Sequence, residues 1–113
     1  MEFSAEQIER LKNSFPEKEV KVATEGGLPY VLISQMGLPE GCNPSIADLL
    51  YCGGPRDGYP SRLFFSATIS GGRGLPWNTT TVILGKTWYA YSWRIDTVQD
   101  PAQSILTHLR ALR

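Results

Sequence analysis

The sequence has few of the residues from which metal sites and nucleic-acid surfaces are built. Its 113 residues include one histidine, His108, and two cysteines, Cys42 and Cys52, which stand far along the chain from that histidine. Zinc sites need several such ligands together, so no metal site is expected. Lysine plus arginine equals aspartate plus glutamate at 11 each, which gives a formal net charge of zero. Without a basic excess, a nucleic-acid partner is not expected either.

The chain also lacks a long apolar run and a secretory leader. A transmembrane helix takes roughly 20 mostly apolar residues, and the sequence contains no such run. The opening Met1-Glu2-Phe3-Ser4 is polar and acidic, unlike a signal peptide. We therefore expect a cytoplasmic protein without membrane association, whose two thiols stay reduced; in an exported protein they would be able to bridge. The length fits a single domain, residues 1–113, and no pattern indicates a cofactor.

Helical periodicity is present at the two ends of the chain. Ser4 and Gln7 have the spacing of a capping box, and apolar residues then recur at helical intervals until a proline. This pattern predicts a helix over residues 5–14 on the flank of a sheet. A second helix is predicted over residues 101–112, with Asp100 as its N-cap and a proline at its first position. Its apolar face comprises Ala102, Ile105, Leu106, Leu109 and Leu112.

Patterns typical of β-strands recur four times between the helices. Alternation predicts a half-buried strand from residue 20, with Val20, Val22 and Thr24 on one face. Three further segments follow between loops rich in glycine and proline: residues 30–33, 46–52 and 63–69. Because loops this short cannot carry parallel crossovers, we expect an antiparallel meander. The predicted fold class is α+β, with an N-terminal helix, a four-stranded meander, an aromatic-rich region and a C-terminal helix.

Residues 84–93 form the most unusual stretch of the sequence. Four of these ten residues are aromatic, and two of the three tryptophans of the chain lie among them. Aromatic rings bury large apolar areas, while their N–H and O–H groups still require hydrogen-bond partners. Such a segment typically lies half in a core and half against a partner or a cleft. A plain hydrophobic strand or turn that closes the domain is the alternative; the order of the surrounding elements favours an active-site-like loop region.

The order of these elements and several short motifs resemble the ubiquitin-conjugating-enzyme (UBC-like) superfamily. The resemblance covers residues 28–113. Tyr59-Pro60 is similar to the Tyr-Pro before the family's fourth strand, and Pro76-Trp77-Asn78 is similar to its His-Pro-Asn motif. Gly85-Lys86-Thr87-Trp88 resembles the Gly-x-x-Cys that carries the family's nucleophile. Trp93, followed by the terminal helix, resembles its Trp-x-Pro region.

A bacterial branch of the superfamily offers a closer resemblance. Residues 38–44, Asp48-Leu49-Leu50 and the run from Gly85 to Ser92 are similar to that branch, whose members are short. These members are encoded in operons with ubiquitin-like proteins, an activating enzyme and a peptidase, and such operons imply antiviral defence. The resemblance therefore implies a ubiquitin-like protein and its activating enzyme as partners, and a transferase role in the modification pathway.

Departures from the family's pattern count against thioester chemistry. By the glycine spacing, Trp88 occupies the position of the catalytic cysteine, and an indole cannot accept an acyl group. In the family's layout neither Cys42 nor Cys52 reaches the catalytic loop, and the histidine of the His-Pro-Asn motif is missing. The chain therefore resembles a short form that lacks the usual catalytic cysteine.

Hydroxyl groups are the remaining candidate nucleophiles. A side-chain hydroxyl would carry the ubiquitin-like protein as an oxyester, with Ser92 as the first candidate and Thr87 as the second. Asn78 matches the family's asparagine, which implies a role as oxyanion donor. No histidine lies nearby in sequence, so the general base is not identified. His108 is predicted at the rim of the C-terminal helix, and a hydrolase-like pair between it and a cysteine thiolate needs a contact that the sequence does not reveal.

Two readings without catalysis stay open. In the first, the chain is a catalytically inactive UBC-like module that binds the ubiquitin-like protein or its activating enzyme. The exposed members of an aromatic set would then be the interface anchors, because aromatic residues dominate binding hot spots. This set is Trp77, Trp88, Tyr89, Tyr91 and Trp93. In the second, the chain is an α+β domain of unrelated purpose, and its aromatic side chains only fill a core.

Overall fold

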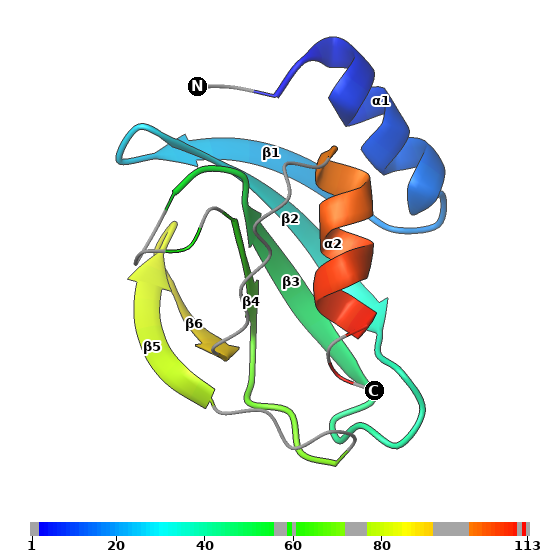
Figure 1. The fold of residues 1–113 in the computed structure, drawn as a ribbon, viewed down its shortest axis with the longest axis vertical. Helices are drawn as coiled ribbons and strands as arrows, with labels where there is room; N and C mark the ends of the chain where they lie inside the picture. Colours follow the sequence, from blue (N-terminus) through cyan, green and yellow to red (C-terminus); the bar gives the residue numbers. More distant parts are fainter. Residues whose placement is uncertain are drawn as a thin grey trace.

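The computed structural model describes residues 3–55, 59, 61–71, 77–91, 100–110 and 112. These residues form two helices and a six-stranded sheet whose neighbouring strands are all antiparallel (Figure 1). The elements are α1 (Ala5–Ser14), β1 (Val20–Glu25), β2 (Leu28–Gly37), β3 (Ile46–Cys52), β4 (Arg62–Phe65), β5 (Trp77–Ile83), β6 (Lys86–Tyr91) and α2 (Pro101–Arg110). The predicted α+β class is confirmed. No helix in this part of the chain is long and apolar enough to span a membrane.

The first four strands form the predicted antiparallel meander, but the sheet continues beyond them. Its strand order is β1-β2-β3-β4-β6-β5, so β6 pairs with β4 and β5 forms an edge. The prediction of four strands followed by an aromatic-rich loop region is therefore wrong, because β5 and β6 form a hairpin. The turn of this hairpin, Leu84 and Gly85, has positive φ angles of 52° and 77°, as two-residue hairpin turns require.

Alternation of side chains explains why the aromatic stretch is a strand. On β6, Thr87, Tyr89 and Tyr91 face one side of the sheet, and Trp88 and Ala90 face the other. Each aromatic ring therefore lies on a definite face, and four of the six side chains of β6 are buried or half-buried. The high aromatic content that we interpreted as a loop is instead the composition of a strand with two packed faces.

Two strands differ in detail from their predicted form. β4 ends at Phe65 rather than at residue 69, because the Ser66 hydroxyl accepts the backbone N–H of Asp48 at 3.0 Å and takes the place of a ladder bond. On β1, Val20 and Val22 lie opposite the buried Ile33 and Val31, so the strand turns its predicted face to the core, but Val22 stays 40 % exposed. β1 is an edge strand that the helices cover only in part.

Both helices pack on the same face of the sheet, where they cover strands β1 to β4 (Figure 1). We call the buried cluster beneath them the helix-side core. Apolar side chains of α1 and α2 meet alternate residues of the strands there, which removes one face of the sheet from water. The cluster includes Leu11, Phe15, Val31, Ile33, Leu49, Tyr51, Phe65, Tyr91, Ile105 and Leu109.

The opposite face of the sheet is buried by the curl of the sheet itself. The β5–β6 turn reaches the β1–β2 turn, where the Leu84 N–H lies 3.2 Å from both carboxylate oxygens of Glu25. Figure 1 shows both turns on the same side of the molecule. We call the enclosed cluster the roll core; its buried members are Tyr30, Leu50, Cys52, Phe64, Ile83, Trp88 and Ala90.

Trp88 is the largest side chain of the roll core and is only 1 % exposed. Its indole N–H donates to the Ile83 carbonyl at 3.1 Å, so the ring is fixed across the hairpin to which it belongs. Nearby, the buried guanidinium of Arg62 donates from Nη2 to the Thr79 hydroxyl at 2.8 Å and connects β4 with β5. The ring of Trp88 thus fills the space that the curl of the sheet creates.

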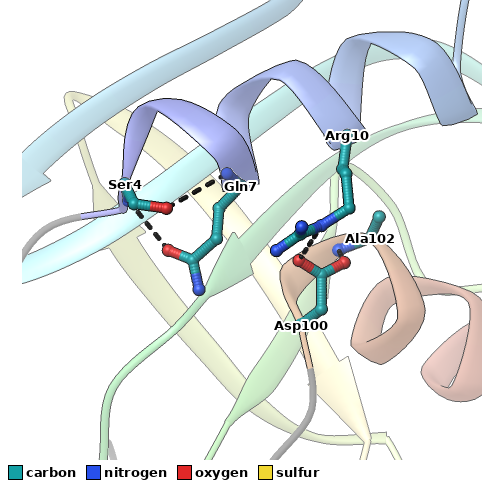
Figure 2. Close-up of polar contacts among 5 residues, drawn as sticks. All are labelled: Ser4, Gln7, Arg10, Asp100 and Ala102. Atoms are coloured by element: carbon teal, nitrogen blue, oxygen red, sulfur yellow. Dashed lines mark hydrogen bonds and ion pairs between the residues drawn. The ribbon is translucent and has the colours of Figure 1, made fainter.

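One carboxylate connects the two helices, as Figure 2 shows. Arg10 on α1 forms an ion pair with Asp100, with Nε and Oδ1 2.9 Å apart. The second carboxylate oxygen of Asp100 accepts the Ala102 N–H at 3.2 Å, so Asp100 caps α2 as predicted. At the start of α1, Ser4 and Gln7 form the predicted capping box. We call the Arg10–Asp100 ion pair the helix clamp, because it connects the N-terminal end of α2 with the middle of α1.

Trp88→Ala is expected to destabilise the fold by about 3–5 kcal/mol, because it leaves a large cavity in the roll core. Denaturant unfolding followed by circular dichroism measures this change. Val82→Ala serves as the control, because Val82 lies in the same hairpin and is 66 % exposed. A cost for Trp88→Ala as small as that of the control would contradict the assignment of Trp88 to the core.

Candidate functional site

The predicted catalytic residues do not come together in the described part of the structure. Thr87 lies on β6 with its side chain exposed, and it pairs with Val82 near the hairpin turn. Asn78 belongs to β5 near the far end of the hairpin; its side chain lies outside the described residues. At about 3.3 Å per residue, Thr87 and Asn78 are roughly 10 Å apart along the hairpin. Ser92 also lies outside the described residues, so its role stays a prediction.

Two of the predicted interface anchors, Trp88 and Tyr91, are buried and so are not available to contact a partner. Trp88 fills the roll core, and Tyr91 is 3 % exposed in the helix-side core. The Tyr91 hydroxyl donates to the carbonyl of His108 at 2.7 Å, which ties β6 to α2. Burial raises the pKa of this hydroxyl well above its ordinary value of 10. Both residues hold the fold together, and Trp93 lies outside the described residues.

Trp77 is half-buried and completes an aromatic cluster with Phe65 and Tyr91. Its ring centroid lies 5.4 Å from that of Phe65 and 5.1 Å from that of Tyr91, both in edge-to-face geometry. Its indole N–H donates to the Ile69 carbonyl at 3.0 Å. A register shift between Trp77 and Thr79 marks a bulge in β5. Because a bulge changes which face the next side chain occupies, Trp77 lies beside Tyr91 whereas Thr79 turns to Arg62.

The outer face of the hairpin is the part of the aromatic region that remains open to solvent. Cross-strand pairs place Thr80 opposite Tyr89 and Val82 opposite Thr87. Thr80, Val82 and Thr87 are exposed, and Tyr89 is half-buried. We call these four residues the hairpin face. Two of them, Thr87 and Tyr89, were predicted as site residues; the continuous run of β-branched residues in β5 is the signal that identifies the strand of the other two.

Neither cysteine offers an accessible thiol. Cys42 is 8 % exposed and packs in the helix-side core, and Cys52 is fully buried in the roll core. The Cys52 thiol lies 3.4 Å from the Gly54 carbonyl, as a donor to it. His108 has its hydrogen bond with Ser61, so the described contacts do not form the hydrolase-like pair with a thiolate. The described residues also contain no group of three or more possible metal ligands.

A buried polar network replaces the rim position predicted for His108. The side chain of His108 is 1 % exposed, and its Nε2 lies 3.2 Å from the Ser61 hydroxyl. Ser61 in turn lies 3.4 Å from the Ser104 hydroxyl. The rim prediction is wrong because these hydroxyl groups give the ring a polar partner inside the core.

Ser61 and His108 form a serine–histidine contact that the sequence did not reveal. Burial, and to a lesser degree the positive charge of Arg62, lowers the pKa of His108 from 6.5 to about 4. Burial likewise raises the pKa of the neighbouring Tyr51, although its hydrogen bonds with Ser104 and Ser61 oppose that change. Since Ser61 is only 9 % exposed, this network joins α2 to the sheet rather than meeting a substrate.

No protein-family model, no curated protein and no solved structure matches this chain. Within the described residues, the hairpin face is the surface where two predicted site residues, Thr87 and Tyr89, reach solvent.

Stability is expected to fall as the pH drops from about 6.5 to about 4. Above pH 6.5 the histidine is neutral in both the folded and the unfolded state, so its lowered pKa does not affect stability. Below pH 6.5 the unfolded state takes up a proton while His108 in the folded state stays neutral, so the free energy of unfolding decreases until the pH reaches about 4. A shift of this size corresponds to about 3 kcal/mol. The measurement is the free energy of unfolding against pH for the wild type and for His108→Gln, which does not titrate. Parallel curves for the two proteins would contradict the assignment.

Proposed function

We propose that the chain is a catalytically inactive UBC-like module that binds a ubiquitin-like protein together with its activating enzyme. The layout of the described elements supports the proposal: a helix, then an antiparallel meander, then a helix on the same face of the sheet. That is the order which the resemblance implies, although the β5–β6 hairpin stands where a loop region was expected.

The burial of Trp88 is the observation that carries the proposal. By the motif resemblance this residue stands where the family has its cysteine, and here the side chain is a core residue instead of a reactive group. Both thiols of the chain are buried as well, so neither is presented for acyl transfer from a partner. The absence of an accessible thiol among the described residues suits binding better than thioester transfer.

The hairpin face is the proposed contact surface. Val82 and the half-buried ring of Tyr89 supply apolar area, and the hydroxyl groups of Thr80 and Thr87 supply hydrogen-bonding groups beside it. Such a mixture is typical of interfaces, in which an apolar centre has a polar rim. The face carries no charged residue, which suits a protein partner better than nucleic acid. Its position on an edge hairpin leaves room for a partner protein to approach.

Val82→Arg is expected to weaken binding of the proposed ubiquitin-like protein and activating enzyme by about tenfold or more, since it places a charge in the contact. Isothermal titration calorimetry with each purified partner gives the affinity. The matched control is Val22→Arg, another exposed valine, which lies on the opposite edge strand. Equal losses in both variants would rule out the hairpin face, and the absence of binding by the wild type would rule out the proposed function.

If the chain were a transferase, a serine such as Ser92 would carry the ubiquitin-like protein as an oxyester. An inactive binding module forms no such ester. The chain is incubated with the activating enzyme, the ubiquitin-like protein and ATP, and then analysed on denaturing gels. We expect no adduct that resists thiols and is cleaved by hydroxylamine. If such an adduct appears in the wild type and is lost in Ser92→Ala, the chain is a serine-dependent transferase and the inactive assignment fails.

A further inference from the structure

An apolar groove lies on the helix side of the molecule, at the opposite half of the sheet from the hairpin face. Its volume of about 460 Å³ falls within the range of roughly 300–1,000 Å³ that is typical of ligand sites. The end of α1, the end of β2 and the C-terminal half of α2 form its walls, and Figure 1 shows the end of β2 beside that half of α2. The apolar lining consists of Phe15, Met36, Leu38, Pro39, Leu106 and Leu109.

The position of the helix clamp explains why the groove is open. The ion pair of Arg10 with Asp100 holds the N-terminal end of α2 to the middle of α1. Beyond this point α1 ends at Ser14, so the later turns of α2 have no helix beside them. As a result Leu106 is 37 % exposed, although it belongs to the apolar face that the sequence predicts for α2.

The groove adjoins a second hollow and has a positively charged side chain in its lining. A second hollow of about 230 Å³ adjoins it through the shared side chains of Phe15 and Met36. Arg110 lines the main groove, and among the described residues it forms no ion pair. Glu17 and Lys18 at the second hollow offset each other in charge. The charge of Arg110 therefore decides the sign of a complementary ligand.

We propose that this groove docks a peptide segment of a protein partner, one that combines apolar anchor residues with an acidic residue. The anchors occupy the space between Phe15 and Leu106, and the carboxylate pairs with Arg110. Met36 in the lining suits such a role, because an unbranched thioether side chain adapts to different anchors. The two adjoining hollows can take successive side chains of one segment, as in other grooves that bind peptides. This interaction is separate from the hairpin face and does not depend on the function proposed for it.

The test uses a phage-displayed library of random short peptides, selected on the wild-type chain. Enriched peptides are expected to contain large apolar residues together with aspartate or glutamate. Fluorescence polarisation should then show a loss of about tenfold in affinity for Leu106→Ser and for Arg110→Glu. Val22→Ser and Lys21→Glu are the matched controls, because both residues are exposed and line neither hollow of the groove; these variants should bind like the wild type.

Several results would overturn the proposal. One is a selection without enrichment; others are peptides that bind Leu106→Ser or Arg110→Glu as well as the wild type, and enriched peptides that are basic. Self-association of the wild type that Leu106→Ser abolishes would instead assign the groove to a second copy of the chain. Leu106 and Arg110 are exposed, so both variants are expected to fold, and their unfolding midpoints confirm this. Failure here leaves the Val82→Arg result unaffected, which separates the two proposals.

Discussion

The fold depends on one constraint: a six-stranded sheet in a chain of 113 residues has to bury both of its faces. Two helices of ten residues each cover one face. The other face has no helix among the described elements, and the sheet curls until its two hairpin turns meet at Glu25 and Leu84. The space within that curl is filled chiefly by Trp88. Without this indole the curl would enclose a void, and voids of side-chain size are costly in proteins.

Local patterns in the sequence were sufficient for much of the fold. α1 and β3 have the predicted bounds, the Ser4–Gln7 capping box forms, and Asp100 caps α2. The misses arose where tertiary structure decides. The alternation within β6 was present in the sequence, but the family resemblance favoured a loop there. The depth of His108 depends on the hydroxyl of Ser61, which lies 47 residues away in the chain, and periodicity carries no information about such a partner. Likewise, the Glu25 contact that closes the curl joins residues 59 positions apart.

The candidate site was predictable only in part, because aromatic content does not distinguish a core from a surface. Trp88 and Tyr91 are core residues, and Trp77 is held in a cluster by its neighbours. What the hairpin presents to solvent is mainly β-branched: Thr80, Val82 and Thr87 around the edge of Tyr89. Both thiols are buried, so neither is an accessible nucleophile. The two surfaces proposed for binding, the hairpin face and the groove beside α2, lie at opposite halves of one sheet.

The position of α2 at the end of the described chain has a consequence for synthesis on the ribosome. Strands β1 to β6 are translated before Ile105 and Leu109, the residues that cover Ile33, Leu49 and their neighbours. Until α2 leaves the exit tunnel, the nascent sheet therefore exposes an apolar surface to the cell, and such surfaces are prone to aggregate or to recruit chaperones. Translation that stalls just before α2 would leave this surface uncovered, so the arrival of α2 is the step that completes the burial of the helix-side core.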